Sequence, residues 1–267
     1  MKPLYMKDIL NYEYPVSTLN STTSQDCSED SFFPEDLVRD FYEWRSNTTE
    51  QFDIYFEISE SDALNCFALI GTNLTSKSQV YLSGSNTSGI GGFSSPTFTK
   101  SLTKKNDKWI LYNSSSFPAC QYYKLTIIAN DSTLSYVQIK RVLAGKAQAF
   151  PIHLLDGYTN GKESYQKRSI QAGQWRPGSE NSMLNVYDIE FNPVFGNKNI
   201  SNNDQSVINE MNSFIEEVRT TTPFLFILNP NKPEDLFDYV VIDGETIDVS
   251  IDDNGTYNYS FTFKELK

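Results

Sequence analysis

The stretch FDIYFEIS, residues 52–59, alternates apolar and polar side chains with the period of two that a half-buried β-strand requires. Similar short patterns follow along the chain at CFALI, QVYLS, KWILY, YYKLTII and YVQIKRVL. Clusters of Gly, Asn, Ser and Pro separate them, and no convincing helix pattern interrupts them. We therefore expect an antiparallel, jelly-roll-like β-sandwich over residues 36–150.

A smaller α+β unit is expected over residues 183–267. It opens with the strand pattern MLNVYDIEF and continues with an amphipathic helix over about residues 203–219. One apolar stripe defines this helix: Val207, Ile208, Met211, Phe214, Ile215 and Val218. The run PFLFILN then has the length of a strand buried on both faces. Two alternating patterns around Asn254-Gly255, a dipeptide typical of type I′ turns, predict a C-terminal β-hairpin.

Two stretches lack a clear periodic pattern. Residues 1–35 are polar and end in a Ser- and Thr-rich segment, which favours an extended N-terminal arm. Residues 151–182 mix turn dipeptides with basic side chains and predict an irregular basic connector. It is either a solvated linker or an interface that meets an acidic surface of a neighbouring copy. The candidate interface residues are Lys162, Lys167, Arg168 and Arg176.

Composition argues against several partners. The 267 residues carry a formal net charge of −12, which disfavours nucleic acid and anionic lipid surfaces. Cys27, Cys66 and Cys120 form no CxxC pair, and their odd number favours a reducing compartment. No secretion signal or apolar run long enough for membrane insertion is present, so we expect synthesis and retention in a cytoplasm.

No catalytic, metal-binding or cofactor-binding motif stands out, so we expect no cofactor and no enzymatic activity. The single histidine, His153, lies between apolar neighbours, which favours a packed or interface role. Acidic residues alternate with apolar ones near the end and predict a solvated sheet face or a docking surface: Glu234, Asp235, Asp238, Asp243, Glu245, Asp248, Asp252 and Asp253. A glycosidase, which needs only two carboxylates, is the alternative that this acidic composition leaves open.

The glycine-rich stretch GSNTSGIGGFSS, residues 84–95, matches neither phosphate-loop pattern, and no helix pattern follows it. It is interpreted as a flexible connection between strands, with a contact to a partner or sugar as the alternative. Sugar sites combine an aromatic platform with polar groups, and Phe93 and Tyr112 are the candidate sugar contacts. Trp109, beside Ile110 and Leu111, is expected in the core.

Two segments, NCFALIGTNLTSKSQVYLSGSN and QYYKLTIIANDSTLSYVQIKRVLAGKAQAF, together resemble a β-sandwich module of tailed-bacteriophage virion proteins. The module looks like a galactose-binding-like jelly roll, and the resemblance covers roughly residues 40–150. Downstream, LNVYDIEFNPV, the amphipathic helix, TTPFLFILNP and the terminal hairpin are similar to the second half of phage tail proteins.

The resemblance implies a non-enzymatic structural component of the virion, an adaptor or ring protein of the tail or tail tip. Its expected partners are other tail proteins and further copies of itself in a ring, with assembly in the cytoplasm of the bacterial host. The alternative is a carbohydrate-binding protein that recognises host-surface glycans through the loop end of the sandwich.

Overall fold

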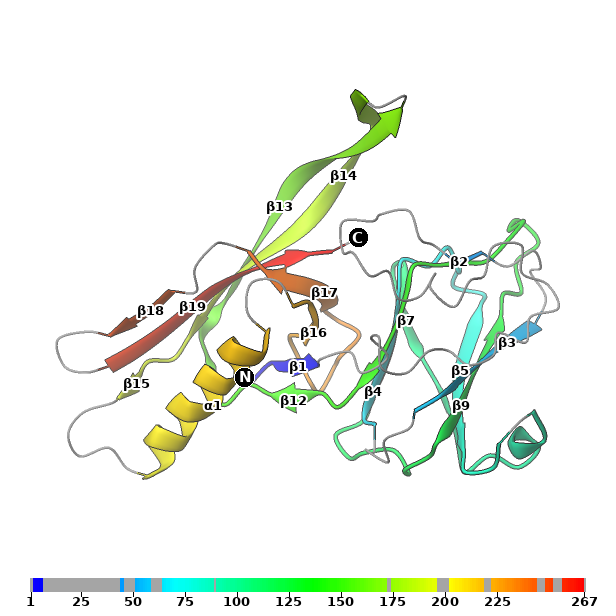
Figure 1. Ribbon diagram of the computed structural model, residues 1–267, viewed down its shortest axis with the longest axis horizontal. Helices are drawn as coiled ribbons and strands as arrows, with labels where there is room; N and C mark the ends of the chain where they lie inside the picture. The colour runs from blue at the N-terminus through cyan, green and yellow to red at the C-terminus, as the bar shows by residue number, and fades with distance from the viewer. Residues whose placement is uncertain are drawn as a thin grey trace. The chain divides into compact units, whose positions relative to one another are not determined.

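The computed structural model describes residues 2–6, 44–45, 51–58, 64–88, 90–171, 174–195, 202–218, 222–243, 248–251 and 256–266. Over these residues the protein is mainly β, with antiparallel sheets and one α-helix (Figure 1). This confirms the mainly β class expected from the sequence. The chain divides into two compact units, called here the two-sheet unit (residues 6–148 and 230–237) and the helix unit (residues 1–5, 149–229 and 238–267).

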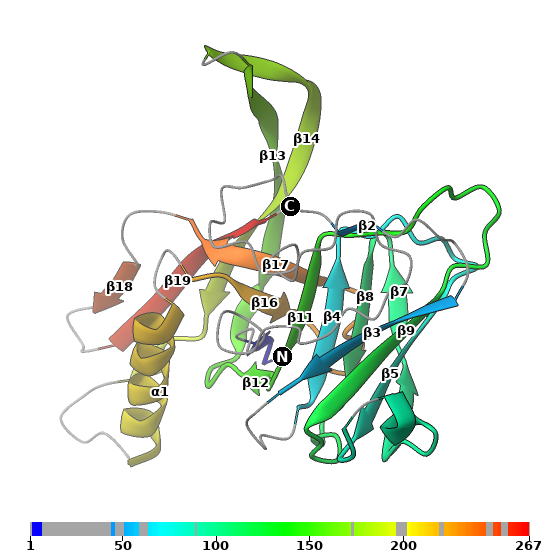
Figure 2. The same cartoon turned by 45° about the vertical axis from the view of Figure 1, so that its right-hand side comes forward.

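The two-sheet unit contains two antiparallel four-stranded sheets. In spatial order the first consists of β11 (Arg141–Gly145), β4 (Cys66–Ile70), β8 (Lys108–Tyr112) and β7 (Thr103–Lys105). The second consists of β3 (Gln51–Glu57), β9 (Tyr122–Ile128), β5 (Gln79–Ser85) and β6 (Phe98–Ser101). Two short strands, β10 (Gln138–Ile139) and β2 (Trp44–Arg45), form a separate pair. Figure 2 labels most of the strands of this unit.

One hydrophobic cluster joins the two sheets. Ile54 and Leu125 of the second sheet lie in the same cluster as Phe67, Leu69 and Trp109 of the first. The side chain of Trp109 is 3% exposed, as expected for a core residue. Because alternate residues point to opposite faces, burial of Ile54 and Leu125 leaves their neighbours on the outward face of the second sheet.

The helix unit is built on a nine-stranded sheet. Its path runs β12 (Gln148–Ala149), β1 (Leu4–Met6), β16 (Phe224–Ile227), β17 (Phe237–Ile242), β19 (Thr256–Glu265), β14 (Gln174–Phe191) and β13 (Leu154–Gln171). Two short strands, β15 (Val194–Phe195) and β18 (Asp248–Ile251), also pair with β19.

The helix α1 spans Asn202–Val218, close to the range expected from its apolar stripe. Ile208, Met211, Phe214 and Val218 are buried. The ring of Phe214 packs edge-on against Phe224 at 5.7 Å between centroids. The stripe therefore faces the sheet, as amphipathicity requires. Residue 219, the expected end of the helix, lies outside the described residues.

Phe150 is fully buried at the centre of an aromatic core in the helix unit. Its ring lies within 4.8–6.5 Å, centroid to centroid, of five other rings: Tyr5, Phe191, Phe214, Phe226 and Phe263. Tyr5 belongs to β1, and the backbone N–H of Phe150 donates to the carbonyl of Pro3 at 3.0 Å. The start of the expected N-terminal arm is thus a sheet strand, and residues 7–35 of that arm lie outside the described residues.

The C-terminal hairpin is observed. β18 and β19 pair in antiparallel register from Asp248↔Ser260 to Ile251↔Tyr257, and the expected turn at residues 254–255 lies outside the described residues. The strand expected in PFLFILN is β16, whose four residues are all buried.

The region expected to be an irregular connector has a different structure. Residues 154–171 and 174–191 form β13 and β14, which pair from Leu154↔Phe191 to Gln171↔Gln174. The dipeptides that indicated turns are accommodated within the strands. Asn160-Gly161 sits inside the regular ladder, while Gly157 and Pro177-Gly178 fall at its two register shifts. Glycine and proline are tolerated at such irregularities, so they do not interrupt the hairpin.

Candidate functional site

The hairpin of β13 and β14 extends beyond the sheet that supports it (Figure 1). β14 pairs with β19 only from Val186 to Glu190. From the pair Lys162↔Asn185 to the pair Gln171↔Gln174, the described pairings join β13 and β14 to each other alone. We call this segment, residues 162–185, the hairpin arm. At about 3.3 Å per residue it reaches roughly 30 Å beyond the last register pair of β14 with β19.

The four candidate interface residues all belong to the hairpin arm. Lys162 is at its base, in register with Asn185, while Arg168 pairs with Pro177 and Arg176 pairs with Ser169. Lys167 lies in the register shift between Gln166 and Arg168. The four basic residues that the sequence indicated therefore all lie in one element. That element is a β-hairpin and not the irregular connector that was expected.

Charge sets the hairpin arm apart from the rest of the chain. It carries four basic residues against two acidic ones, Glu163 and Glu180, in a protein of net charge −12. In the helix unit, acidic side chains are exposed on β14 and on α1, among them Asp188, Glu190 and Glu210. A basic arm and acidic surfaces on the same chain are electrostatically complementary between copies.

The second candidate site lies on the outward face of the sheet β3-β9-β5-β6. The glycine-rich segment folds over this face through the short 3-10 helix η2 (Ile90–Phe93). The Ser85 hydroxyl donates to the Gly92 carbonyl at 2.9 Å and accepts from the backbone N–H of Thr87 at 3.0 Å. Hydrogen bonds of Ser85 thus link the start of the segment to Thr87 and Gly92.

This loop brings Phe93 against side chains of two strands. Its ring lies 5.5 Å from the ring of Tyr55 on β3, and the Lys124 ammonium on β9 lies 5.6 Å from the Phe93 centroid. Tyr55 and Lys124 are register partners in neighbouring strands. Phe93 remains partly exposed, so the loop adds an aromatic surface to a polar sheet face.

Asp53 links the polar groups of this face. Its carboxylate accepts hydrogen bonds from the Thr126 hydroxyl at 2.6 Å and the Tyr55 hydroxyl at 3.3 Å. The Lys124 ammonium lies 3.8 Å from the same carboxylate. Partial burial, followed by the charge of Asp53, raises the pKa of Tyr55 to about 12. Tyr55 therefore stays neutral and acts as a hydrogen-bond donor at physiological pH.

Tyr112, the other candidate sugar contact, is on a different sheet. It ends β8, where it pairs with Cys66 of β4. Burial, followed by the nearby Cys66, raises the pKa of Tyr112. Phe93 packs against the sheet containing β3 and β9, so the structure does not join Phe93 and Tyr112 in one site.

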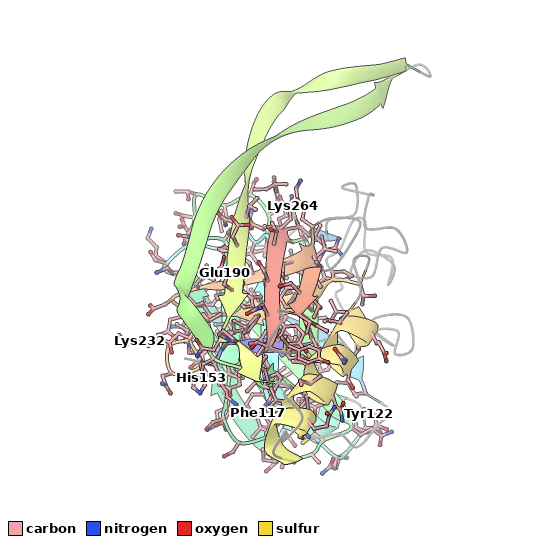
Figure 3. All side chains as sticks on the ribbon, turned by 90° about the vertical axis from the view of Figure 1, so that its left-hand side faces the viewer. Phe117, Tyr122, His153, Glu190, Lys232 and Lys264 are labelled. Carbon is pink, nitrogen blue, oxygen red and sulfur yellow. The ribbon has the colours of Figure 1, made fainter. Side chains whose placement is uncertain are left out.

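Other functional groups are placed as follows. Cys66 and Cys120 are buried free thiols, and burial raises the pKa of each; Cys27 lies outside the described residues. His153 is exposed. Asp238, expected on a solvated face, is instead 3% exposed. Figure 3 shows the labelled side chains, with Glu190 on β14 and Lys264 on the neighbouring strand β19.

Among the residues that the structure describes, no group of three or more His, Cys, Asp or Glu side chains is arranged to hold a metal ion. Within the same residues, no helix has the length and apolar character needed to cross a membrane. No known family model matches the chain, and no curated protein is similar enough to count as a relative.

Proposed function

We propose that this protein is a non-enzymatic structural component of a tailed-phage virion. It acts as an adaptor or ring protein of the tail or tail tip and is assembled in the cytoplasm of the bacterial host. Its two-sheet unit is the galactose-binding-like jelly-roll sandwich that the sequence resembles. The hairpin arm joins one copy to its neighbours or to other tail proteins.

The observation that carries this proposal is the hairpin arm itself. An isolated two-stranded hairpin is only marginally stable in water, because neither face is covered and both edges are open. Beyond Val186 the described pairings give the arm no third strand. An open strand edge is a template for pairing with another chain. A neighbouring subunit that covers the arm would supply the missing contacts.

Charge supports the same proposal. The basic arm and the acidic surface of a second copy attract each other, which favours encounter and fixes relative orientation. Like-charge repulsion between copies with a net charge of −12 opposes association elsewhere. When one patch of each copy binds a different patch of the next copy, the copies form a closed ring if the rotations between successive copies add up to a full turn.

The experiment is native mass spectrometry of the purified protein and of an arm-truncated variant, over a range of protein and salt concentrations. Glu163 and Leu184 are register partners, so residues 164–183 can be replaced by a two-residue Asn-Gly turn. The replacement keeps Leu184, which is buried. Thermal unfolding checks that the helix unit of the variant remains folded.

The proposal predicts a discrete ring-sized oligomer that dissociates as salt rises and that the truncated variant does not form. A strict monomer at every concentration would contradict the homo-oligomeric ring. An oligomer that survives truncation unchanged would show that assembly does not use the hairpin arm.

The face around Phe93 favours a second function, binding of host-surface glycans. A partly exposed aromatic ring beside Tyr55, Lys124 and Asp53 combines the apolar surface and the hydrogen-bonding groups that sugar sites use. Tyr112 provides a matched control, because it is an aromatic residue of the same unit on the other sheet. Saturable glycan binding lost in Phe93→Ala and kept in Tyr112→Ala would support this function. Absence of binding to any host glycan would contradict it.

A further inference from the structure

Two buried carboxylates lie at the base of the hairpin arm. Asp238 of β17 is 3% exposed and Glu265 of β19 is 2% exposed. Both lie beside β14 at the point where it leaves the sheet. Asn185 and Tyr187 of β14 contact them through hydrogen bonds. Strand register explains the meeting, because Val240 pairs with Glu265 while Tyr187 pairs with Phe263.

Each carboxylate holds a specific group of β14. The backbone N–H of Asn185 donates to Glu265 Oε2 at 3.0 Å. The Asn185 side-chain amide donates to Asp238 Oδ2 at 3.2 Å, and the Tyr187 hydroxyl donates to the same oxygen. Asn185 is thus bound through both its backbone and its side chain, by two different strands.

Asn185 lies where β14 leaves the sheet, so these hydrogen bonds act at the start of the hairpin arm. The last residue of β14 that pairs with β19 on this side is Val186, opposite Lys264. Asn185 is the next residue, and its other neighbour in register is Lys162 of β13. At this branch point a side-chain carboxylate, Glu265, accepts the hydrogen bond of a β14 backbone N–H group.

Filling a buried position with a carboxylate costs free energy. Desolvation of a charge opposes folding, and well-packed apolar residues of similar size often give equal or greater stability. The same sheet contributes Phe263 and Val240 nearby, so apolar filling is compatible with this part of the core. Apolar side chains could fill these positions, whereas only an acceptor such as a carboxylate can hold the Asn185 backbone N–H and side-chain amide in one orientation.

We infer that Asp238 and Glu265 are positioning residues that fix the direction in which the hairpin arm leaves the sheet. They hold Asn185 and Tyr187 so that the arm is presented to its partner in one orientation, which lowers the entropic cost of association. The inference rests on the proposed function, because it concerns the arm as an assembly element.

The test measures the direction of the arm in the separate subunit. Spin labels are attached at Ser169→Cys in the arm and Ser260→Cys on β19, in a background with Cys27→Ser; Cys66 and Cys120 are buried. Pulsed electron spin resonance gives the distribution of distances between the labels at a salt concentration where the protein is monomeric. Hydrogen exchange of the Asn185 amide is followed in parallel.

Glu265→Leu should at least double the width of the distance distribution and accelerate Asn185 exchange tenfold or more, without a lower melting temperature. Glu265→Gln keeps an acceptor oxygen and should restore a narrow distribution. Asp188→Asn is the matched control, because Asp188 is an exposed β14 carboxylate that accepts from the Thr262 hydroxyl. It should leave both measurements unchanged.

A folded Glu265→Leu variant with a wild-type distance distribution and wild-type Asn185 exchange would overturn the inference. If Glu265→Leu does not fold, Asp238→Leu, which removes the acceptor of the Asn185 side-chain amide, provides the decisive variant, and an unchanged distribution in that protein would also overturn the inference. These measurements do not depend on assembly. Normal assembly of the arm-truncated protein would contradict the proposed function while leaving the positioning result intact.

Discussion

The Lys124 ammonium lies 5.6 Å from the ring centroid of Phe93, although the two residues come from different segments of the two-sheet unit. A cation over an aromatic face is attracted by the ring quadrupole. The Phe93 ring also packs at a tilt against Tyr55. The glycine-rich loop is therefore attached to the sheet by an aromatic residue at its end as well as by the hydrogen bonds of Ser85 at its start.

Phe93→Ala should lower the free energy of unfolding by about 1–3 kcal/mol, because it removes a partly buried ring and its contacts. A double-mutant cycle with Lys124→Met isolates the ring–ammonium contact, for which we expect a coupling of about 0.5–1 kcal/mol. Urea unfolding of the four proteins gives both values. Strictly additive effects would contradict an energetic contact between Phe93 and Lys124.

Gly92→Ala should destabilise the same loop. A Cβ at residue 92 would lie 2.1 Å from the backbone carbonyl oxygen of Thr87, which belongs to the loop and cannot rotate away. We expect a loss of about 1–3 kcal/mol in the free energy of unfolding. Gly91→Ala is the matched control, since a Cβ there meets no atom within 4 Å. Equal melting temperatures for the two variants would contradict the close approach.

Local patterns predicted the elements that depend on local periodicity. FDIYFEIS became β3 because its alternation matches a sheet with one buried face, and the apolar stripe around Met211 and Phe214 became α1. The alternation around residues 254–255 became the pair β18 and β19 for the same reason. In each case the side chains that form the core are spaced within one short segment.

Features that depend on contacts between distant segments of the chain could not be predicted from local patterns. Asp238 lies in a run of alternating acidic and apolar residues, which favours a solvated face, yet it is buried by contact with Tyr187 of β14. The hairpin of β13 and β14 was missed because Gly157 and Pro177-Gly178 are of types common in turns, and only the pairing between the strands shows that they fall at register shifts. Phe93 likewise contacts residues of two distant segments, Tyr55 of β3 and Lys124 of β9. The sequence indicated Phe93 as a candidate contact but neither of these partners.

Stability at acid pH should depend on Asp131. Its carboxylate accepts hydrogen bonds from the backbone N–H and the hydroxyl of Thr133, at 3.0 and 2.7 Å. These bonds, followed by one from Thr75, lower the pKa of Asp131 from 3.8 to about 2. A lowered pKa in the folded state means that the unfolded state binds more protons as the pH falls. The stabilisation is therefore complete when the pH is above the ordinary pKa of 3.8, and it is lost as the pH falls through the folded-state pKa of about 2.

Asp131→Asn should accordingly reduce the urea midpoint at neutral pH, and its difference from the wild-type protein should shrink as the pH falls below about 4. Urea titrations at several pH values measure the difference. A difference that stays constant down to pH 2 would show that Thr133 does not stabilise the ionised form.

Reversal of charge in the hairpin arm should weaken assembly without unfolding the subunit. In Lys167→Glu/Arg168→Glu the arm keeps its backbone pairing, while its attraction to an acidic partner becomes repulsion. We expect dissociation at a salt concentration at least several-fold lower than for the wild-type oligomer, with an unchanged melting temperature of the monomer. Native mass spectrometry and thermal unfolding measure the two quantities.

The matched control is Lys104→Glu/Lys105→Glu, which reverses two adjacent lysines on β7 of the two-sheet unit and so changes the net charge equally. If both double variants weaken assembly alike, the effect comes from total charge and not from the arm. If the arm variant assembles normally while the truncated protein does not, the arm acts through the open edges of its strands. In that case backbone pairing, which is independent of side-chain charge, would hold the subunits together.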